Sequence, residues 1–255
     1  MLKRFLKRFA SRTWYRPGVV RKILAGPCKG LRYRIFPEYG LSPILGGWEP
    51  DAQALMVKYI GPEWVVYDIG ANYGIHTLLM SRLAYSGCVY AFEPIPQILS
   101  ALRENVSLNR FDNVVCVPLA ISDRVGSCSF VAGHHRGAGH LIDSSVVEEN
   151  AITVKTITLD KFVFDEGHDK PNLIKIDVEG TESKVLLGAA QILREARPIL
   201  LVDLHTPDQD VAVGQILQKN NYSAYRVPGG ERVQNLEKGW PHLTGLWGQF
   251  IALPL

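Results

Sequence analysis

The feature that most constrains the fold is a strand-like run that leads directly into a glycine-bearing turn. Residues 64–69 are apolar apart from Asp68, and Gly70 and Gly74 follow before a helical pattern begins. Glycines in such a turn permit close backbone approach, and in doubly wound sheets the carboxyl end of the first strand is where a ligand binds. The sequence therefore predicts a doubly wound α/β fold with a ligand site at this turn, where Asp68 places a carboxylate.

Short apolar runs alternate with helical patterns over most of the chain, which is typical of βαβ units and a parallel sheet. Strands are expected at 31–36, 64–69, 89–92, 114–119, 173–176, 199–204, 224–227 and 249–252. Helices are expected at 50–60, 74–84, 96–109, 181–196 and 208–221. Two extra strands, 127–131 and 153–159, break the alternation, and the Gly- and His-rich stretch 133–150 between them is predicted to be a mobile loop.

Basic residues are concentrated near the N-terminus, where residues 1–37 hold 11 of the 28 Lys and Arg residues and none of the 25 Asp and Glu residues. Apolar side chains recur at helical spacing in the first ten residues with basic ones between them, which predicts a basic amphipathic helix. Residues 1–22 would dock on an anionic membrane surface or an acidic partner, or else pack on the chain's own domain. We therefore divide the chain into a basic extension, 1–47, and a main domain, 48–255.

Composition excludes several other classes of protein. The chain beyond residue 37 is acidic and shows no aromatic and basic RNA-binding motif, so nucleic acid is not an expected partner. The four cysteines form no Cys-x-x-Cys pair and are interpreted as reduced thiols in a reducing compartment. No apolar stretch approaches the roughly 20 residues of a membrane-spanning helix, and the start lacks a secretory apolar core. The sequence predicts a cytoplasmic protein, with peripheral membrane association left open and no signal for an oligomeric state.

Glu93 ends the second strand of the predicted sheet, 25 residues after Asp68. A carboxylate there is placed to accept hydrogen bonds from the two hydroxyls of an adenosine ribose. The turn lacks the G-x-G-x-x-G spacing that seats a pyrophosphate, since Asn72 lies two residues after Gly70. S-adenosylmethionine has no phosphate and carries an ammonium and a sulfonium group, so it tolerates the carboxylate of Asp68. These residues favour S-adenosylmethionine over NAD.

Four motifs add a family resemblance. They are Asp68-Ile69-Gly70-Ala71-Asn72-Tyr73-Gly74, Ala91-Phe92-Glu93-Pro94, Ala120-Ile121-Ser122-Asp123 with Gly126, and Ile174-Lys175-Ile176-Asp177-Val178-Glu179-Gly180 followed by Glu182 and Leu186-Leu187-Gly188. Together they resemble the FkbM family of class I methyltransferases over about residues 48–205. The resemblance implies a Rossmann-like sheet of seven strands with the last one antiparallel. It also implies S-adenosylmethionine as cofactor, contacted by Asp68, Gly70, Asn72 and Glu93, with Ala120 near the adenine.

Gly74, Pro94 and Glu49 complete the predicted cofactor site. Glu49 falls just before the first helix of the main domain, where it closes the cofactor or acceptor pocket or else caps that helix.

Methyl transfer to a hydroxyl requires alignment of the acceptor and removal of its proton. Alternation in the fourth core strand directs Lys175, Asp177 and Glu179 to one side. Asp177 and Glu179 are predicted to act as a base or to hold the acceptor hydroxyl, with charge pairing in the loop as the alternative. His205, after the fifth core strand, is the first choice of general base because its ordinary pKa lies near 6.5. A divalent ion held by Asp177, Asp203 and His205 is less favoured, because no tight metal-ligand motif is present.

The predicted function is transfer of a methyl group to a hydroxyl of a sugar, glycolipid or polyketide-like acceptor. The first alternative is a non-catalytic domain of the same fold that binds a membrane or a partner protein, and the basic helix is consistent with it. The second alternative is an NAD-binding oxidoreductase, and the missing phosphate-loop glycines argue against it. His134, His135 and His140 could form a lid or a metal cluster, but solvated loop residues are the simpler interpretation.

Overall fold

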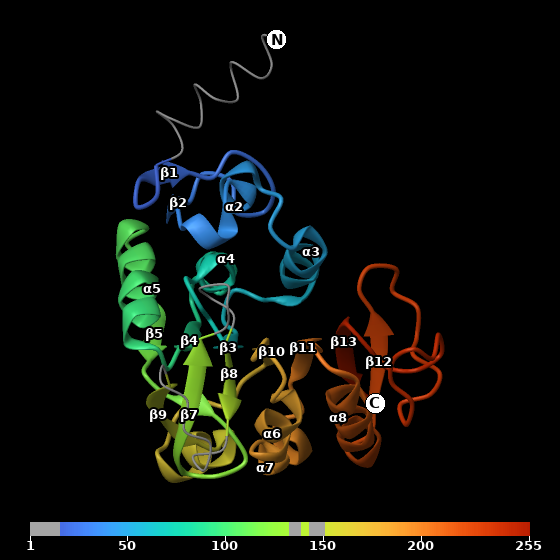
Figure 1. Cartoon of the computed structure of the whole chain (residues 1–255). Helices are drawn as coiled ribbons and strands as arrows, with labels where there is room; N and C mark the ends of the chain where they lie inside the picture. The colour runs from blue at the N-terminus through green and yellow to red at the C-terminus, as the bar shows by residue number, and fades with distance from the viewer. Residues whose placement is uncertain (1–15, 133–138, 143–150) are drawn as a thin grey trace.

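The computed structural model describes residues 16–132, 139–142 and 151–255, and its centre is a seven-stranded sheet in the order β12-β13-β11-β10-β3-β4-β5 (Figure 1). The strands are β3 (Val65–Ile69), β4 (Cys88–Phe92), β5 (Val114–Val117), β10 (Leu173–Ile176), β11 (Ile199–Asp203), β12 (Tyr222–Arg226) and β13 (Gln249–Pro254). Within this sheet only β13 runs antiparallel to its neighbours, β11 and β12. The predicted doubly wound sheet with an antiparallel last strand is therefore confirmed.

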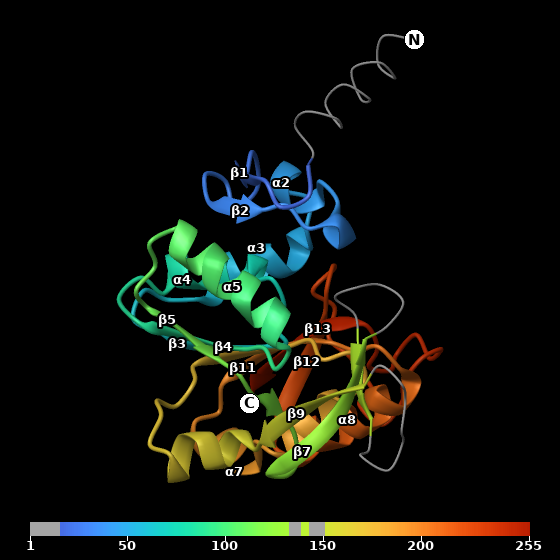
Figure 2. The ribbon, with the colours of Figure 1, turned by 60° about the vertical axis from the view of Figure 1, so that its left-hand side comes forward.

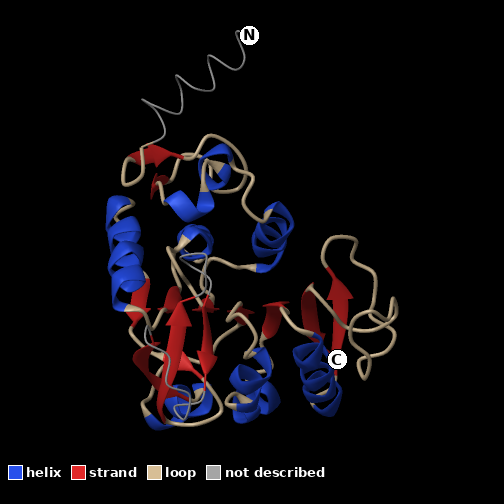
Figure 3. Cartoon of the chain, in the orientation of Figure 1, coloured by secondary structure: helices blue, strands red, loops and turns tan. Residues whose placement is uncertain are grey.

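Helices cover both faces of this sheet (Figure 2 and Figure 3). One face carries α3 (Pro50–Tyr59), α4 (Ile75–Leu83) and α5 (Pro96–Leu108), and the other carries the π-helical turn η2 (Lys161–Asp165), α6 (Glu182–Leu187), α7 (Ala190–Glu195) and α8 (Pro207–Lys219). Because side chains alternate along a strand, Val66 joins the apolar core under α4 and Tyr67 joins the core on the opposite face. Asp68 and Lys175 are register partners on β3 and β10, and they share the α4 side.

The prediction of one helix over 181–196 is wrong, because α6 ends at Leu187 and α7 begins at Ala190. The chain passes so close to its neighbour at Gly188 that an added Cβ would lie 2.1 Å from the carbonyl oxygen of Ser122. The carboxylate of Asp160 then accepts hydrogen bonds from the first backbone N–H groups of α7, at 2.8 and 2.9 Å. These contacts, distant in sequence, end one helix and start the next.

A second sheet, in the order β6-β9-β7-β8, lies beside the first. Its strands are β6 (Ala120–Ile121), β7 (Gly126–Ala132), β8 (Gly139–Ile142) and β9 (Ala151–Ile157). Part of the predicted loop 133–150 is thus the strand β8, which pairs with β7 and contains His140. His134 and His135 lie outside the described residues.

The described part of the basic extension packs over α4 and α5 (Figure 1). It contains β1 (Val20–Lys22), β2 (Arg32–Arg34), the 3-10 turn η1 (Pro37–Tyr39) and α2 (Ser42–Leu45). Ile23, Tyr33 and Ile35 are buried in the apolar core that α4 also lines. Backbone N–H groups of β2 donate to the side chains of Asn105 in α5 and of Asn109, which directly follows α5. Residues 16–47 therefore form one wall above the sheet, and the domain boundary at 47 stays a prediction.

The predicted amphipathic helix of the first ten residues falls outside the described part of the chain. Among the described residues, no helix combines the length and the apolar character needed to span a membrane.

Candidate active site

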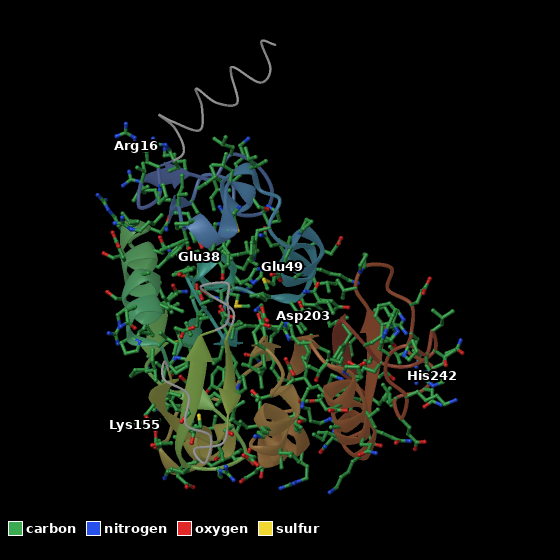
Figure 4. The ribbon with its side chains drawn as sticks, in the orientation of Figure 1. Arg16, Glu38, Glu49, Lys155, Asp203 and His242 are labelled. Carbon is green, nitrogen blue, oxygen red and sulfur yellow. The ribbon has the colours of Figure 1, made fainter. Side chains whose placement is uncertain are left out.

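A cavity of about 330 Å³ lies at the carboxyl ends of β3, β4, β10 and β11, beneath the N-terminal wall. Figure 4 shows Glu49 and Asp203 near each other in this region, between α3 and the strand ends. The predicted site residues that line the cavity are Glu49, Gly70, Asn72, Gly74, Glu93, Pro94, Ala120, Asp177, Glu179 and His205. Asp68 is absent from the lining, and Tyr39 and His76, to which no sequence pattern pointed, are present in it.

The turn between β3 and α4 forms one end of the cavity. Gly70 has a φ of +80°, and an added Cβ there would lie 1.9 Å from the carbonyl oxygen of Asp177. Gly74 has a φ of +86°, and its added Cβ would lie 2.3 Å from Leu102. Both positions therefore require glycine, for backbone conformation and for space. The close approach at Gly70 is what brings the ends of β3 and β10 to one site.

Glu93, which follows β4, is almost fully buried beside this turn. Its Oε2 accepts a hydrogen bond from the backbone N–H of Asn72 at 3.1 Å, and its Oε1 accepts one from Ile95 at 2.8 Å. Burial raises the pKa of the Glu93 carboxyl to about 7, although these two N–H groups lower it. The carboxylate is thus fixed in place, and each oxygen keeps acceptor capacity toward the cavity.

Asp68 lies under the floor of the cavity and is fully buried. Its Oδ2 accepts a hydrogen bond from the Thr77 hydroxyl at 2.6 Å, and its Oδ1 lies 3.9 Å from the ammonium of Lys175. Lys175 is also buried, and its Nζ lies 3.0 Å from Oδ2 of Asp177. Burial lowers the pKa of Lys175, but the carboxylates of Asp177, Asp68 and Glu49 outweigh burial and raise it overall. Lys175 therefore stays charged and joins the two strand ends electrostatically.

His205 lies at the centre of a group of carboxylates near the ends of β10 and β11. Its Nδ1 donates to Oε1 of the fully buried Glu182 at 2.8 Å. Its Nε2 lies 3.6 Å from Oδ1 of Asp177 and 3.5 Å from Oε2 of Glu179. The hydrogen bond to Glu182 raises the pKa of His205 to about 9, against the effect of burial and together with the Asp177 and Glu179 carboxylates. The imidazole of His205 therefore holds its proton more tightly than its ordinary pKa near 6.5 implies.

The carboxylates near His205 differ in their proton affinity. Burial raises the pKa of Asp203 to about 6, with a further contribution from Asp177. Burial also raises the pKa of Asp177, but Lys175 and His205 outweigh it and lower that pKa overall. Burial raises the pKa of Glu179 above its ordinary value. Asp177 is thus the most acidic of these three carboxyl groups.

Glu49 faces the cavity instead of capping α3. It occupies the position before α3, where its side chain makes no capping hydrogen bond. Its Oε2 accepts a hydrogen bond from the side-chain amide of Gln249 at 3.4 Å and lies 3.7 Å from Nε2 of His76. His76 is buried in the first turn of α4, and burial, with the nearby Lys175 charge, lowers its pKa to about 4. The imidazole of His76 is therefore neutral.

Aromatic side chains of the N-terminal wall and of Trp48, which directly follows it, complete the cavity. The Tyr39 and Trp48 rings lie 4.2 Å apart between centroids, and both residues line it. Phe36 stacks on Tyr73 of the β3–α4 turn, with centroids 3.7 Å apart. The wall thus packs against the glycine-bearing turn through this pair of stacked rings.

Comparison with known proteins gives one family and several relatives. The model of the "Methyltransferase FkbM domain" matches residues 68–226. Hexuronic acid methyltransferase AglP of Haloferax volcanii is 30% identical over 69% of this chain and 70% of its own length. The 2-O-methyltransferase NoeI of Sinorhizobium fredii is 28% identical over 61% of this chain and 68% of its own length.

Among solved structures, a methyltransferase FkbM from Methylobacillus flagellatus KT shares the fold with a TM-score of 0.50 and 17% sequence identity. The match covers 76% of this chain and 44% of that longer chain.

Proposed function

Because this chain belongs to the FkbM methyltransferase family, we propose that it transfers the methyl group of S-adenosylmethionine to a hydroxyl of a sugar, glycolipid or polyketide-like acceptor. The names of two relatives specify a hexuronic acid and a 2-O position. The observation that carries the proposal is one cavity that is lined both by the Glu93 carboxylate and by the cluster of His205, Asp177 and Glu179.

The cofactor end of the cavity is formed by the glycine-bearing turn, Glu93, Pro94 and Ala120. We assign the two ribose hydroxyls to Glu93, since its carboxylate is held by backbone N–H groups and retains free acceptor positions. Asp68 is too deeply buried to line the cavity, and its proposed part is to hold Lys175 beneath the bound cofactor.

Cofactor affinity should fall as the pH falls through 7. The pKa of Glu93 is about 7 in the unliganded protein, and ribose hydroxyls bind the ionised carboxylate best. Below that pH binding must displace a proton, so affinity drops by up to about tenfold per pH unit. Calorimetric titration between pH 8 and 5.5 measures this, with Glu93→Gln as the control that binds weakly at every pH. A wild-type affinity that is flat over this range would remove the Glu93 carboxylate from the cofactor site.

The acceptor end of the cavity contains Asp177, Glu179 and His205. In the proposed reaction, the acceptor oxygen forms a bond to the methyl carbon while the carbon–sulfur bond breaks and its electron pair stays on sulfur. The hydroxyl proton passes to this cluster, and S-adenosylhomocysteine is released. The protein's part is alignment of the hydroxyl and removal of the proton.

Tyr39 and Trp48 lie outside residues 68–226 and line the same cavity. Flat aromatic faces pack well against the apolar face of a sugar ring or a macrolide. We propose that these two residues select the acceptor, so acceptor choice depends on the N-terminal wall as well as on the matched domain.

Incubation with S-adenosylmethionine that carries a deuterated methyl group tests the proposed activity. A panel of hexosides, uronides, glycolipids and macrolides is screened by mass spectrometry, with release of S-adenosylhomocysteine as the second readout. The proposal expects a deuteromethyl ether on at least one acceptor. Methylation that occurs only at nitrogen or carbon would contradict it.

We further propose that residues 1–22 contact an anionic membrane surface, on the strength of their charge and apolar spacing. Deletion of residues 1–12 should reduce sedimentation with vesicles that contain phosphatidylserine, and the loss should shrink at high salt. Equal sedimentation of the full chain and the deletion variant would reject membrane contact.

A further inference from the structure

We propose that Asp177, Glu179 and His205 bind a divalent metal ion of the Mg²⁺ and Mn²⁺ class where β10 and β11 end. The role of the ion rests on the proposed function, in which these three residues, all in the cavity lining, face the acceptor. The binding itself follows from the geometry of these three side chains and is measured without any acceptor.

The three side chains converge without direct hydrogen bonds between them. One ligand atom from each lies within 4.8 Å of the others. Nε2 of His205 lies 3.6 Å from Oδ1 of Asp177 and 3.5 Å from Oε2 of Glu179, which is too long for hydrogen bonds. Metal–ligand bonds of about 2.0 to 2.6 Å would span the space between these atoms. One imidazole and two carboxylates on one side of an ion leave positions open for other ligands.

Two of the three ligands, His205 and Asp177, are held by a partner that leaves the metal-facing atom free. Glu182 is fully buried and fixes Nδ1 of His205, so that Nε2 faces the carboxylates. A carboxylate behind a ligating histidine is the usual outer partner in metal sites. Lys175 pairs with Oδ2 of Asp177 at 3.0 Å and leaves Oδ1 toward His205. Glu179 has a left-handed backbone, with a φ of +57°, at the turn that follows β10.

An independent observation points to a polar occupant of this cavity. Nε2 of His76 is buried and has no hydrogen-bond partner among the described residues, and His76 lines the cavity. Buried polar atoms without a partner are rare in native proteins, because an unmade hydrogen bond costs about 1 to 3 kcal/mol. A ligand or a water held by the ion would provide the missing partner.

The charges around the triad favour a cation. Asp203 and Glu49 also line the cavity, whereas the ammonium of Lys175 is paired with Asp177 and Asp68. Buried carboxylates need compensating positive charge. A bound divalent ion would orient the acceptor hydroxyl and make its proton more acidic. Loss of that proton to a neighbouring carboxylate or to water would balance the methyl transfer described above.

The test is binding of Mn²⁺ to the full chain, followed by electron paramagnetic resonance as the free-ion signal disappears. We expect sub-millimolar binding by the wild type, competition by Mg²⁺, and nitrogen modulation from a directly bound imidazole. Asp177→Asn, Glu179→Gln and His205→Ala should each weaken Mn²⁺ binding by at least about tenfold, since outer partners alone contribute 10- to 100-fold. Glu49→Gln removes the same charge from the same cavity and should have a much smaller effect.

Three results would overturn the inference: no Mn²⁺ binding by the folded wild type, no nitrogen modulation in the bound state, or an equal loss in Glu49→Gln. The nitrogen signal is read on the wild type, so the test holds even where a variant fails to fold. S-adenosylmethionine is titrated into the same samples. If the protein binds S-adenosylmethionine but no Mn²⁺, the inferred metal site is rejected and the proposed methyltransferase function still stands.

Discussion

Lys175→Met is expected to destabilise the protein by about 3 to 5 kcal/mol, the usual cost of removing one partner from a buried ion pair. Lys175 is 4% exposed, and its Nζ lies 3.0 Å from Asp177 and 3.9 Å from Asp68. Methionine keeps the length of the side chain but leaves the fully buried Asp68 carboxylate with the Thr77 hydroxyl as its only side-chain donor among the described residues. Urea unfolding at pH 7 measures the loss as a lower transition midpoint.

Two further variants separate charge from packing. Asp68→Asn added to Lys175→Met should recover part of the lost stability, because it removes the uncompensated charge. Lys170→Met removes an exposed lysine paired with Glu195 and should change stability by less than about 1 kcal/mol. If Lys175→Met unfolded at the wild-type urea concentration, Lys175 would not compensate buried charge in this site.

His205→Ala is expected to lower turnover by about 10²- to 10⁴-fold, the usual range for loss of a group that handles a proton in the transition state. His205 follows β11 and Glu93 follows β4, and β10 and β3 lie between these two strands in the sheet. Affinity for S-adenosylmethionine should therefore stay within about threefold of the wild type, a change below about 1 kcal/mol.

His242→Ala is the matched control, since His242 is exposed on the β12–β13 connection, away from the cavity (Figure 4). Its turnover should equal that of the wild type. Normal turnover by His205→Ala would exclude His205 from the reaction, both as a base and as a metal ligand.

The sheet and the cofactor end could be predicted from the sequence because local patterns determine them. Apolar runs end in Gly70 and Glu93, and the parallel sheet brings both strand ends to one edge. The family resemblance and the fold that it implied are confirmed. The individual roles of the site residues remain predictions.

The contacts that the sequence could not reveal are between residues far apart in the chain. The pKa of His205 depends on its hydrogen bond to Glu182, a fully buried residue 23 positions away in the chain. Asp68 is at the predicted strand end, but its burial beneath the cavity depends on how Lys175 packs from β10. Tyr39 reaches the cavity because the N-terminal segment folds back over α4, and no local pattern encodes that placement.

Calorimetric titration of the full chain with S-adenosylmethionine, S-adenosylhomocysteine and NAD in parallel tests the central claim most directly. The proposed methyltransferase should bind both adenosyl ligands with micromolar dissociation constants and should not bind NAD. Binding of NAD alone would favour an oxidoreductase on the same sheet. Absence of binding by both adenosyl ligands would contradict the claim, and the cavity at Glu93 would then belong to a protein without methyltransferase activity.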